Sequence, residues 1–519
     1  MKKIVIDPVT RIEGHLKIEA TVENGVVKDA KSSGTLFRGL ELILVGRDPR
    51  DATQITQRIC GVCPIVHSTA SAFCLDDAFG IADQIPNNGR IIRNLVLGSN
   101  FLQSHILHFY HLAALDYVDV TSVADYEGTN PELQSVKNFI ARGELAPFVP
   151  RYEGDYRLTK EQNRAAVAHY LQALHMRRKA HEMLSLFGGK VPHNCAIIAG
   201  GVTERPAVDK ITAFLWRLNE IRDFINNVYI PDVLMVAGAY SNHFTIGRGC
   251  GNYLCYGVFD LQAAPSDLNK KSRLFKPGTT STTLEPGTID PAKIIEHVKH
   301  SWYDDSTTGR HPSNGETVPR HPKRDAYSWI KSPRYNGKPC EVGPLARVLV
   351  AYSQGVPEVK QAVDRLLREL KAQPDALFSV LGRHAARALD AKLVADAMAD
   401  WVLQLTPDEP VYQPYQLPQE SNGAGLVDGP RGALGHWIQI KDGAISKYQA
   451  VVPTTWNASP RDDAGVPGPI EQAIIGTKVK DPSNPFEIVR IVRSFDPCLA
   501  CSIHLVTPKG WAAGKARVF

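Results

Sequence analysis

The sequence lacks three features, each of which would assign it to a broad class of protein. It has no run of about 18 apolar residues, so we expect no membrane-spanning helix in this chain. Its formal net charge is only +5 over 519 residues, which gives no support for nucleic-acid binding. Near the N-terminus, Asp7 and Pro8 interrupt the apolar segment that a signal peptide requires, so we expect no export signal of its own.

The cysteines do not form the pattern of a disulfide-stapled protein. There are nine, an odd number, in a chain whose 43% hydrophobic residues suffice for a large core. Four of them make two Cys-x-x-Cys pairs. We expect the other five to be small buried hydrophobic residues, and these are Cys74, Cys195, Cys250, Cys255 and Cys340.

The order of hydrophobic patterns predicts an α+β fold that is mainly helical. Residues 1–35 alternate like strands about an Asn24-Gly25 turn, which predicts a small antiparallel sheet. Helical periodicity and caps predict helices over 64–79, 88–119, 159–188, 206–228 and within 357–405. Glycine and proline are frequent over 240–345, where we expect short strands and loops, and over 408–470, where we expect two strands near 434–451. No linker or repeat divides the chain, so we expect a central bundle of long helices with irregular β additions, folded as one unit.

The predicted helix over 88–119 carries three histidines at intervals of three residues, which are His105, His108 and His111. A spacing of three drifts around the helix surface and does not keep one face. We therefore interpret these side chains as hydrogen-bonded core or interface histidines and not as metal ligands.

The strongest functional signal is a Cys-x-x-Cys pair near each end of the chain, each followed by a histidine. The first pair is Cys60 and Cys63, the second is Cys498 and Cys501, and 434 residues lie between the pairs. Thiolates at i and i+3 can reach one metal ion or a tight pair of ions, and soft sulfur ligands suit nickel, iron, copper and zinc. A structural zinc site stays possible, but so long a separation is more typical of a site that the whole fold serves. A redox pair of the thioredoxin type needs a βαβ context, which neither motif has.

Both motifs resemble those of the large subunit of nickel–iron hydrogenases, which read Arg-x-Cys-Gly-x-Cys near the N-terminus and Asp-Pro-Cys-x-x-Cys-x-x-His near the C-terminus. The resemblance continues along the chain at residues 11–15, 38–41, 108–112, 188–193, 341–347, 452–457 and 460–462. It implies the large-subunit fold and a catalytic subunit that cleaves H2 heterolytically and reversibly into protons and electrons, used mainly to oxidise H2.

By the same resemblance, the four motif cysteines hold a nickel–iron centre. Cys60 and Cys498 would be terminal ligands of nickel, while Cys63 and Cys501 would bridge nickel and iron. His67 would donate a hydrogen bond to a bridging sulfur from outside the ligand set.

The iron would also carry one carbon monoxide and two cyanides, in a pocket that matches Pro453, Thr454, Pro460 and Arg461. A hydroxyl and a guanidinium suit the cyanides because each can donate a hydrogen bond to an anionic acceptor. Arg461 would form a polar canopy over the metals together with Asp496. Ser104 stands where relatives often have an aspartate, so the arginine would lose one charged partner.

Two acidic residues receive roles from the resemblance. Glu13 would be the proton relay, and we expect it to take a proton from Cys498, because burial raises the pKa of a carboxyl group toward the working pH. Glu41, the backbone carbonyl of Ala450 and His504 would hold a second metal ion, Mg²⁺, which prefers oxygen ligands.

Residues 505–519 form a tail with three basic side chains and no acidic one. In the family, a maturation endopeptidase cuts after the corresponding histidine once nickel-insertion proteins have loaded the metal. We therefore interpret residues 1–504 as one large-subunit domain and the tail as a maturation peptide, removed by cleavage between His504 and Leu505.

The chain has no further cysteine cluster that suits an iron–sulfur centre, so electrons would leave through an iron–sulfur small subunit. An export signal on that partner would place the enzyme at the membrane or in the periplasm, and the cytoplasm is the alternative. Two other functions stay open. One is an H2 sensor with slow turnover, which the tail disfavours because sensors in the family lack one. The other is a relative without metals, which the complete set of four cysteines disfavours.

Overall fold

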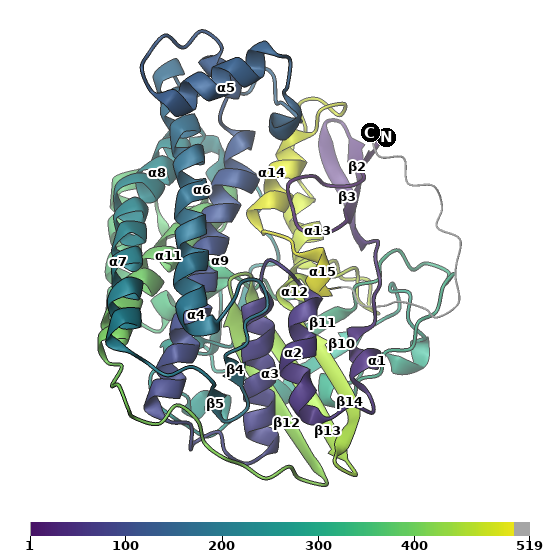
Figure 1. The fold of residues 1–519 in the computed structure, drawn as a ribbon. Helices are drawn as coiled ribbons and strands as arrows, with labels where there is room; N and C mark the ends of the chain where they lie inside the picture. The colour runs from purple at the N-terminus through teal and green to yellow at the C-terminus, as the bar shows by residue number, and fades with distance from the viewer. Residues whose placement is uncertain (1, 503–519) are drawn as a thin grey trace.

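The computed structural model of the protein describes residues 2–502, and for Pro147, Cys501 and Ser502 it describes the backbone alone. Helices and small sheets alternate along this chain (Figure 1), as the sequence predicts for an α+β fold that is mainly helical.

Four long helices form the bundle on one side of the molecule (Figure 1). They are α4 (Asn87–Ile106), α6 (Lys160–Gly188), α7 (Val208–Phe224) and α11 (Val380–Leu403). Helix α6 begins with the predicted capping box, in which Thr159 and Gln162 bind each other's backbone N–H groups, and ends at Gly189. The bundle encloses the largest hydrophobic core, to which α4, α6, α7 and α11 all contribute.

The three histidines at and just beyond the end of α4 are hydrogen-bonded, as predicted; His105 and His108 are buried and His111 is half-buried. Helix α4 continues into a π-helical turn, Leu107–Ala113, instead of the single helix to residue 119 that the pattern predicts. The partners are acceptors on other elements: His105 Nε2 lies 2.8 Å from Asp390 Oδ2, His108 Nε2 lies 2.6 Å from the carbonyl of Arg493, and His111 Nε2 lies 3.2 Å from the carbonyl of Tyr170.

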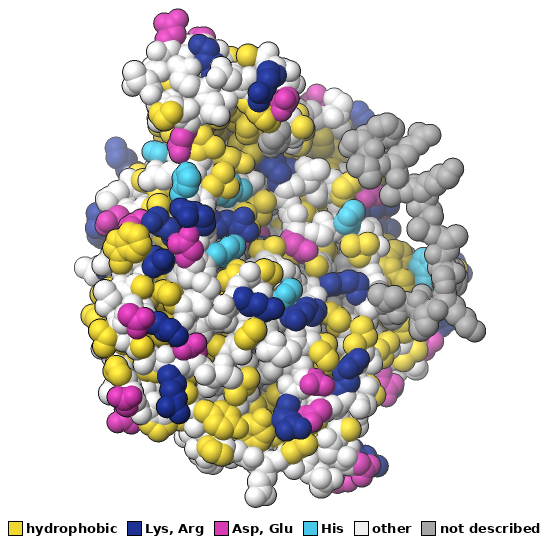
Figure 2. All heavy atoms as spheres, viewed as in Figure 1, with side chains coloured by type: hydrophobic (Ala, Val, Ile, Leu, Met, Phe, Trp, Pro, Cys, Tyr) yellow, Lys and Arg dark blue, Asp and Glu magenta, His cyan; other side chains and the backbone are white. Residues whose placement is uncertain are grey.

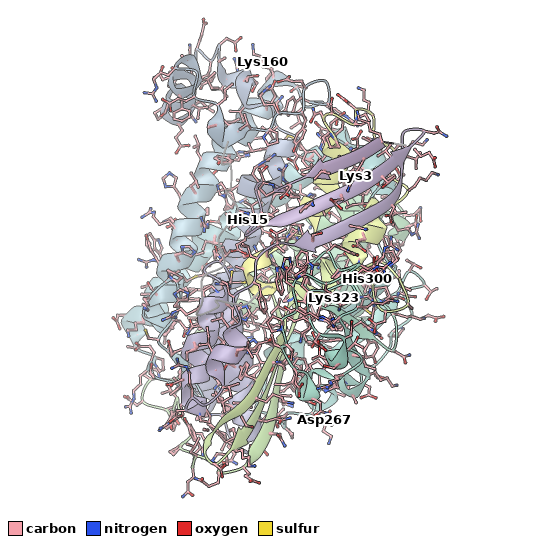
Figure 3. The ribbon with its side chains drawn as sticks, turned by 90° about the vertical axis from the view of Figure 1, so that its right-hand side faces the viewer. Lys3, His15, Lys160, Asp267, His300 and Lys323 are labelled. Carbon is pink, nitrogen blue, oxygen red and sulfur yellow. The ribbon has the colours of Figure 1, made fainter. Side chains whose placement is uncertain are left out.

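An antiparallel sheet at the N-terminus lies against C-terminal helices. Its strands are β1 (Lys2–Ile6), β2 (Leu16–Glu23) and β3 (Val26–Gly34), in that order. Burial alternates along β2, and its buried face packs on α13 (Pro469–Ile474) and α14 (Phe486–Ser494). Figure 3 shows this sheet face-on, with the yellow C-terminal helices behind it. The label of His15 marks the residue that directly precedes β2. The N-terminal sheet is thus packed on helices that precede the second cysteine pair.

A second antiparallel sheet contains one strand that the sequence pattern does not predict. Strands β13 (Gly432–Lys441) and β14 (Ala444–Val451) are the two expected strands, and β12 (Ser421–Gly429) precedes them. Strand β12 is rich in glycine because it packs directly on α3 (Pro64–Ala78). A Cβ atom on Gly425 would lie 1.9 Å from the carbonyl oxygen of Ala70.

The remaining elements are short or lie at the surface. The other helices are α1 (Leu40–Leu44), α2 (Ala52–Thr56), α5 (Pro131–Ala141), α8 (Ile230–Ala239), α9 (Pro344–Ser353), α10 (Pro357–Leu370), α12 (Pro453–Asn457) and α15 (Leu499–Ser502). Two-stranded sheets lie within 240–345, as predicted, and their strands are β6 (Asn252–Cys255), β7 (Val258–Asp260), β8 (Arg273–Phe275), β9 (Gly278–Ser281), β10 (Ile294–His297) and β11 (Ser332–Tyr335). One more pair, β4 (Ile197–Ile198) and β5 (Gly201–Val202), precedes this region.

The surface agrees with the small net charge. Basic and acidic side chains are both spread over the face seen in Figure 2. Among residues 2–502, no helix has the length and apolar character needed to cross a membrane.

The isolated cysteines are mostly buried. Cys74, Cys255 and Cys340 are buried and Cys250 is half-buried, but Cys195 is exposed, so the prediction of a buried side chain is wrong there. Cys195 follows the end of α6 in an irregular segment, which does not pack it into the core. No disulfide joins any two of the eight cysteines whose side chains are described.

Candidate metal centre

The fold brings the two Cys-x-x-Cys motifs together. Cys60 ends a short 3₁₀ turn, and Cys63 is the N-cap of α3, where Pro64 takes the first helical position. Cys498 follows α14 and immediately precedes α15. The first motif therefore lies at the start of one helix, and the second is delivered by the end of another.

Three buried thiol groups converge at one point. Cys498 Sγ lies 3.3 Å from Cys60 Sγ and 3.9 Å from Cys63 Sγ, and all three sulfur atoms lie within 4.8 Å of one another. Two thiolates bound about 2.3 Å from one metal in tetrahedral geometry are about 3.8 Å apart. The three sulfurs thus have the spacing of ligands to a shared soft metal or a compact pair of metals.

Backbone N–H groups support negative charge on the first of these sulfurs. The N–H groups of Val62 and Cys63 point to Cys60 Sγ at 3.3 and 3.5 Å. Such donors favour a thiolate, which is the form that binds metals. The backbone of Cys501 lies in α15, one helical turn after Cys498, while its side chain lies outside the described residues.

Glu13 is in direct contact with Cys498. The thiol of Cys498 donates to Glu13 Oε2 at 3.2 Å, and the N–H of Ala500 donates to the same oxygen at 2.8 Å. The backbone N–H of Leu499 also donates to the Glu13 carbonyl at 2.8 Å, so residue 13 and the second motif form a short parallel bridge. Burial, together with negative charge at Cys60, raises the pKa of Glu13.

Gly14 allows the C-terminal segment to approach this closely. Its φ angle is +79°, and a Cβ atom there would lie 2.7 Å from Cβ of Leu499. A larger residue at position 14 would push the second motif away from Glu13.

The arginine over the cysteines is Arg431, and the prediction for Arg461 is wrong. Arg431 lies in the turn between β12 and β13 and is 3% exposed. Its Nε and Nη2 donate to the carbonyl and carboxylate of Asp496, each at 3.0 Å, and its Nη1 lies 3.4 Å from Ser104 Oγ. Burial disfavours its charge, but Asp496 and the three cysteines, when ionised, outweigh burial and raise the pKa of Arg431 above its ordinary value.

Arg461 lies at the edge of the N-terminal sheet. Its guanidinium pairs with Asp29 of β3 and donates to the carbonyl of Gly465 at 2.9 Å. Asp496 and Ser104, predicted as the surroundings of Arg461, are thus in contact with Arg431 instead, and a canopy over the metals stays a prediction.

Pro453, Thr454 and Pro460 are all buried, and the first two lie near the second motif. The hydroxyl of Thr454 accepts a hydrogen bond from the backbone N–H of Cys498 at 2.9 Å, and Pro453 begins α12 beside it. Pro460 is farther removed in its contacts, because its carbonyl accepts from Ser332 Oγ at 2.8 Å.

His67 is a buried neutral imidazole next to the site. Burial lowers its pKa to about 4, while the charge of Cys60 acts in the opposite direction. Its Nδ1 lies 3.3 Å from His436 Nε2, and His436 Nδ1 lies 2.8 Å from the hydroxyl of Tyr448. These contacts fix the ring orientation of His67, and its predicted bond to a bridging sulfur stays a prediction.

The structure brings Glu41 and Ala450 together. The N–H of Ala450 donates to Glu41 Oε1 at 3.0 Å, and the hydroxyl of Thr317 donates to Glu41 Oε2. A second buried carboxylate, Glu296, lies close enough for the charge of Glu41 to raise its pKa beyond the effect of burial, although Lys331 acts in the opposite direction. The predicted ligand His504 and the predicted cleavage site at Leu505 lie outside the described residues, as does the tail over 505–519.

Comparison with known proteins assigns this site to a family. A model of nickel-dependent hydrogenases matches residues 38–504, and a model described as HoxL-like matches residues 3–33. The chain belongs to the nickel-dependent hydrogenase family. It is the large, catalytic subunit of a hydrogenase, an oxidoreductase that acts on H2, which confirms the family, fold class and enzyme class predicted from the sequence.

Several characterised hydrogenases are similar over nearly their whole length. The large subunit of the periplasmic [NiFeSe] hydrogenase of Desulfomicrobium baculatum is 44% identical, over 97% of this chain and 95% of that protein. The uptake hydrogenase large subunit of Rhizobium leguminosarum bv. viciae is 38% identical, over 100% of this chain and 97% of that protein. The structure of the Ni-Fe-Se hydrogenase of D. vulgaris Hildenborough in its as-isolated oxidized state superposes with a TM-score of 0.86 at 43% identity, covering 97% of this chain and 100% of that one.

Two residues of this hydrogenase site were missed or given no role from the sequence. Arg431 stands in Gly429-Pro430-Arg431-Gly432, and an arginine in a Gly-Pro turn just before a predicted strand was the available signal. Arg38 lies in one of the segments that resemble the family. It contacts both cysteine segments, which no local sequence pattern indicates.

Proposed function

We propose that this hydrogenase subunit holds a nickel–iron centre between its two cysteine pairs. Cys60 and Cys498 would be terminal ligands of nickel, while Cys63 and Cys501 would bridge the two metals. The convergence of three buried sulfurs with Glu13 in contact with one of them is the observation that carries the proposal. When bound, the centre supplies the site at which H2 is polarised and its electrons are taken up.

The iron would carry one carbon monoxide and two cyanides under the canopy of Arg431. Arg431 can donate to an anionic cyanide because its guanidinium is buried, charged and fixed by Asp496. The apolar ring of Pro453 suits carbon monoxide, which accepts hydrogen bonds poorly. The hydroxyl of Thr454 is oriented by the backbone N–H of Cys498, so its own hydrogen is free to point elsewhere.

The protein's own part in the reaction is to hold and move a proton. Cys498 Sγ would receive the proton from H2, and Glu13 Oε2, 3.2 Å away, would accept it. Ala500 fixes the carboxylate through its N–H, so the relay needs no rearrangement before the transfer. Electrons would leave through an iron–sulfur small subunit, the partner that a hydrogenase large subunit implies.

Glu41, the carbonyl of Ala450 and His504 would hold a Mg²⁺ ion. Two buried carboxylates, Glu41 and Glu296, lie near each other with Lys331 as a counter-cation. Oxygen donors of this kind, with retained waters, suit Mg²⁺. The N–H of Ala450 donates to Glu41 and so orients the carboxylate toward strand β14.

The tail over 505–519 would be removed after metal insertion by an endopeptidase acting between His504 and Leu505. Glu13, Thr454 and Arg38 all bind the segment that precedes the tail. We further propose a periplasmic or membrane-associated location through the small subunit, since relatives include a periplasmic enzyme and a quinone-reactive one.

The test is H2-dependent dye reduction by the purified large–small subunit complex, with hydrogen–deuterium exchange measured in parallel. We expect sustained turnover and intact mass corresponding to a chain that ends at His504. Exchange with only slow dye reduction would favour the H2 sensor, and a full-length active chain would refute the maturation peptide.

A further inference from the structure

Arg38 connects the two halves of the metal centre. Its Nη2 donates to the carbonyl oxygen of Ile59 and, at 2.6 Å, to the carbonyl oxygen of Ala500. Ile59 directly precedes Cys60, and Ala500 directly precedes Cys501. One guanidinium thus holds the backbone beside a cysteine of each pair.

The charge of Arg38 also acts within the site. Its third bond goes to the carbonyl of Arg58 at 3.2 Å, so its three hydrogen bonds to the described chain all go to neutral acceptors. Among residues 2–502, no ion pair joins Arg38 to a carboxylate. The pKa of His67, lowered first by burial, is lowered further by the positive charge of Arg38, so this charge is felt by the imidazole that lies next to the site.

The contacts of Arg38 differ in kind from those of Glu13 and Thr454. Glu13 and Thr454 accept hydrogen bonds from N–H groups between residues 498 and 500. Arg38 instead donates to a carbonyl of that segment and reaches the first motif with the same group. Thiolates repel one another, and a cation that bridges their backbones offsets this repulsion.

We propose that Arg38 is a positioning residue that keeps the second cysteine pair docked on the first and thereby sets how firmly the metal centre is retained. This inference rests on the nickel–iron centre proposed above. A planar guanidinium suits the role because it can donate to several carbonyls in one plane, which a lysine ammonium cannot reproduce.

The test compares nickel retention in the purified large–small subunit complex carrying Arg38→Met, Arg38→Lys or the control Arg47→Met. Arg47 lies just after α1, and its Nε donates to the carbonyl of Ile43 in that helix, at 2.8 Å, not to either cysteine segment. The rate of nickel release to a chelator is measured for each variant at a temperature the same number of degrees below its own melting temperature. Differences in overall stability are thereby removed from the comparison.

We expect Arg38→Met to release nickel about tenfold faster than the wild type, as is typical for loss of a group that orients metal ligands. Arg38→Lys should lie between them, and Arg47→Met should match the wild type. Release from Arg38→Met at the wild-type rate would overturn the proposal. If Arg38→Met does not fold, Arg38→Lys decides: faster release supports the role, and wild-type release rejects it. A wild-type complex without nickel would instead overturn the metal assignment on which the inference rests.

Discussion

Replacing Glu13 with glutamine tests the proposed proton transfer with little change of shape. In the wild type, the N–H of Ala500 donates to the Glu13 carboxylate at 2.8 Å. Glutamine can keep this bond by turning its side-chain oxygen toward the same N–H group. The amide cannot accept a proton from Cys498, whose sulfur lies 3.2 Å from the carboxylate. The variant therefore removes the proton acceptor and retains most of the contacts.

The expected loss of rate is large compared with the expected loss of stability. A positioned proton acceptor contributes about 10² to 10⁴ in rate, which corresponds to about 3–5 kcal/mol in the barrier. Exchanging one hydrogen-bonded carboxylate for an amide changes the free energy of unfolding by about 1 kcal/mol. Glu13→Gln should thus stay folded while H2 oxidation and hydrogen–deuterium exchange fall by at least about 100-fold.

Two controls separate proton transfer from structure. Glu19→Gln makes the same change on β2, at a residue that pairs with Lys3 and Lys17 on the sheet surface, and should leave the rates unchanged. Glu13→Asp keeps the carboxylate but withdraws it by one methylene, so its rate should lie between those of the wild type and Glu13→Gln. Wild-type exchange in Glu13→Gln, with nickel content unchanged, would remove Glu13 from the proton path.

Three further predictions concern the canopy, the core and the pH dependence of stability. Arg431→Lys should lower H2 oxidation by at least about tenfold with nickel retained, because an ammonium cannot donate to the backbone carbonyl and the carboxylate of Asp496 in the plane of the guanidinium and still face the cysteines. Wild-type kinetics in that variant would remove Arg431 from the site. Gly425→Val should destabilise the fold by about 3 kcal/mol or more, since its Cβ would overlap the carbonyl of Ala70, and an unchanged melting temperature would contradict this packing. Burial raises the pKa of Glu471 to about 7 in the folded protein. Between about pH 4.5 and 7 the carboxyl group therefore stays protonated in the folded chain but ionises in the unfolded chain. The free energy of unfolding should thus fall by up to about 3 kcal/mol as the pH rises through this range. Glu471→Gln should flatten the change of melting temperature over that range, and an identical pH profile would refute the assignment to this residue.

The long helices could be predicted because their signals are local. Thr159 and Gln162 form a capping box, which spans only four residues and predicts the start of α6. Both of its hydrogen bonds are present. Strand β12 could not be predicted, because Ser421–Gly429 reads as a flexible glycine-rich segment. Its glycines are explained only by the backbone of α3, which is distant in sequence and lies against them.

In the candidate site, too, local motifs could be predicted and contacts between distant segments could not. Cys60, Cys63 and Cys498 belong to short motifs, and the fold brings them together as predicted. The canopy arginine was assigned wrongly because the chain contains the dipeptide Pro-Arg twice in this region, at 430–431 and at 460–461. Only the packing distinguishes the two, since Arg431 is buried against Asp496 while Arg461 pairs with Asp29 at the sheet edge.

The most direct test of the account is to locate the metal by anomalous scattering at the nickel absorption edge, in crystals of the large–small subunit complex. We expect a nickel peak among the sulfur atoms of Cys60, Cys63 and Cys498, with Glu13 in contact with the Cys498 sulfur. A peak at the same place that appears only at the zinc edge would contradict it.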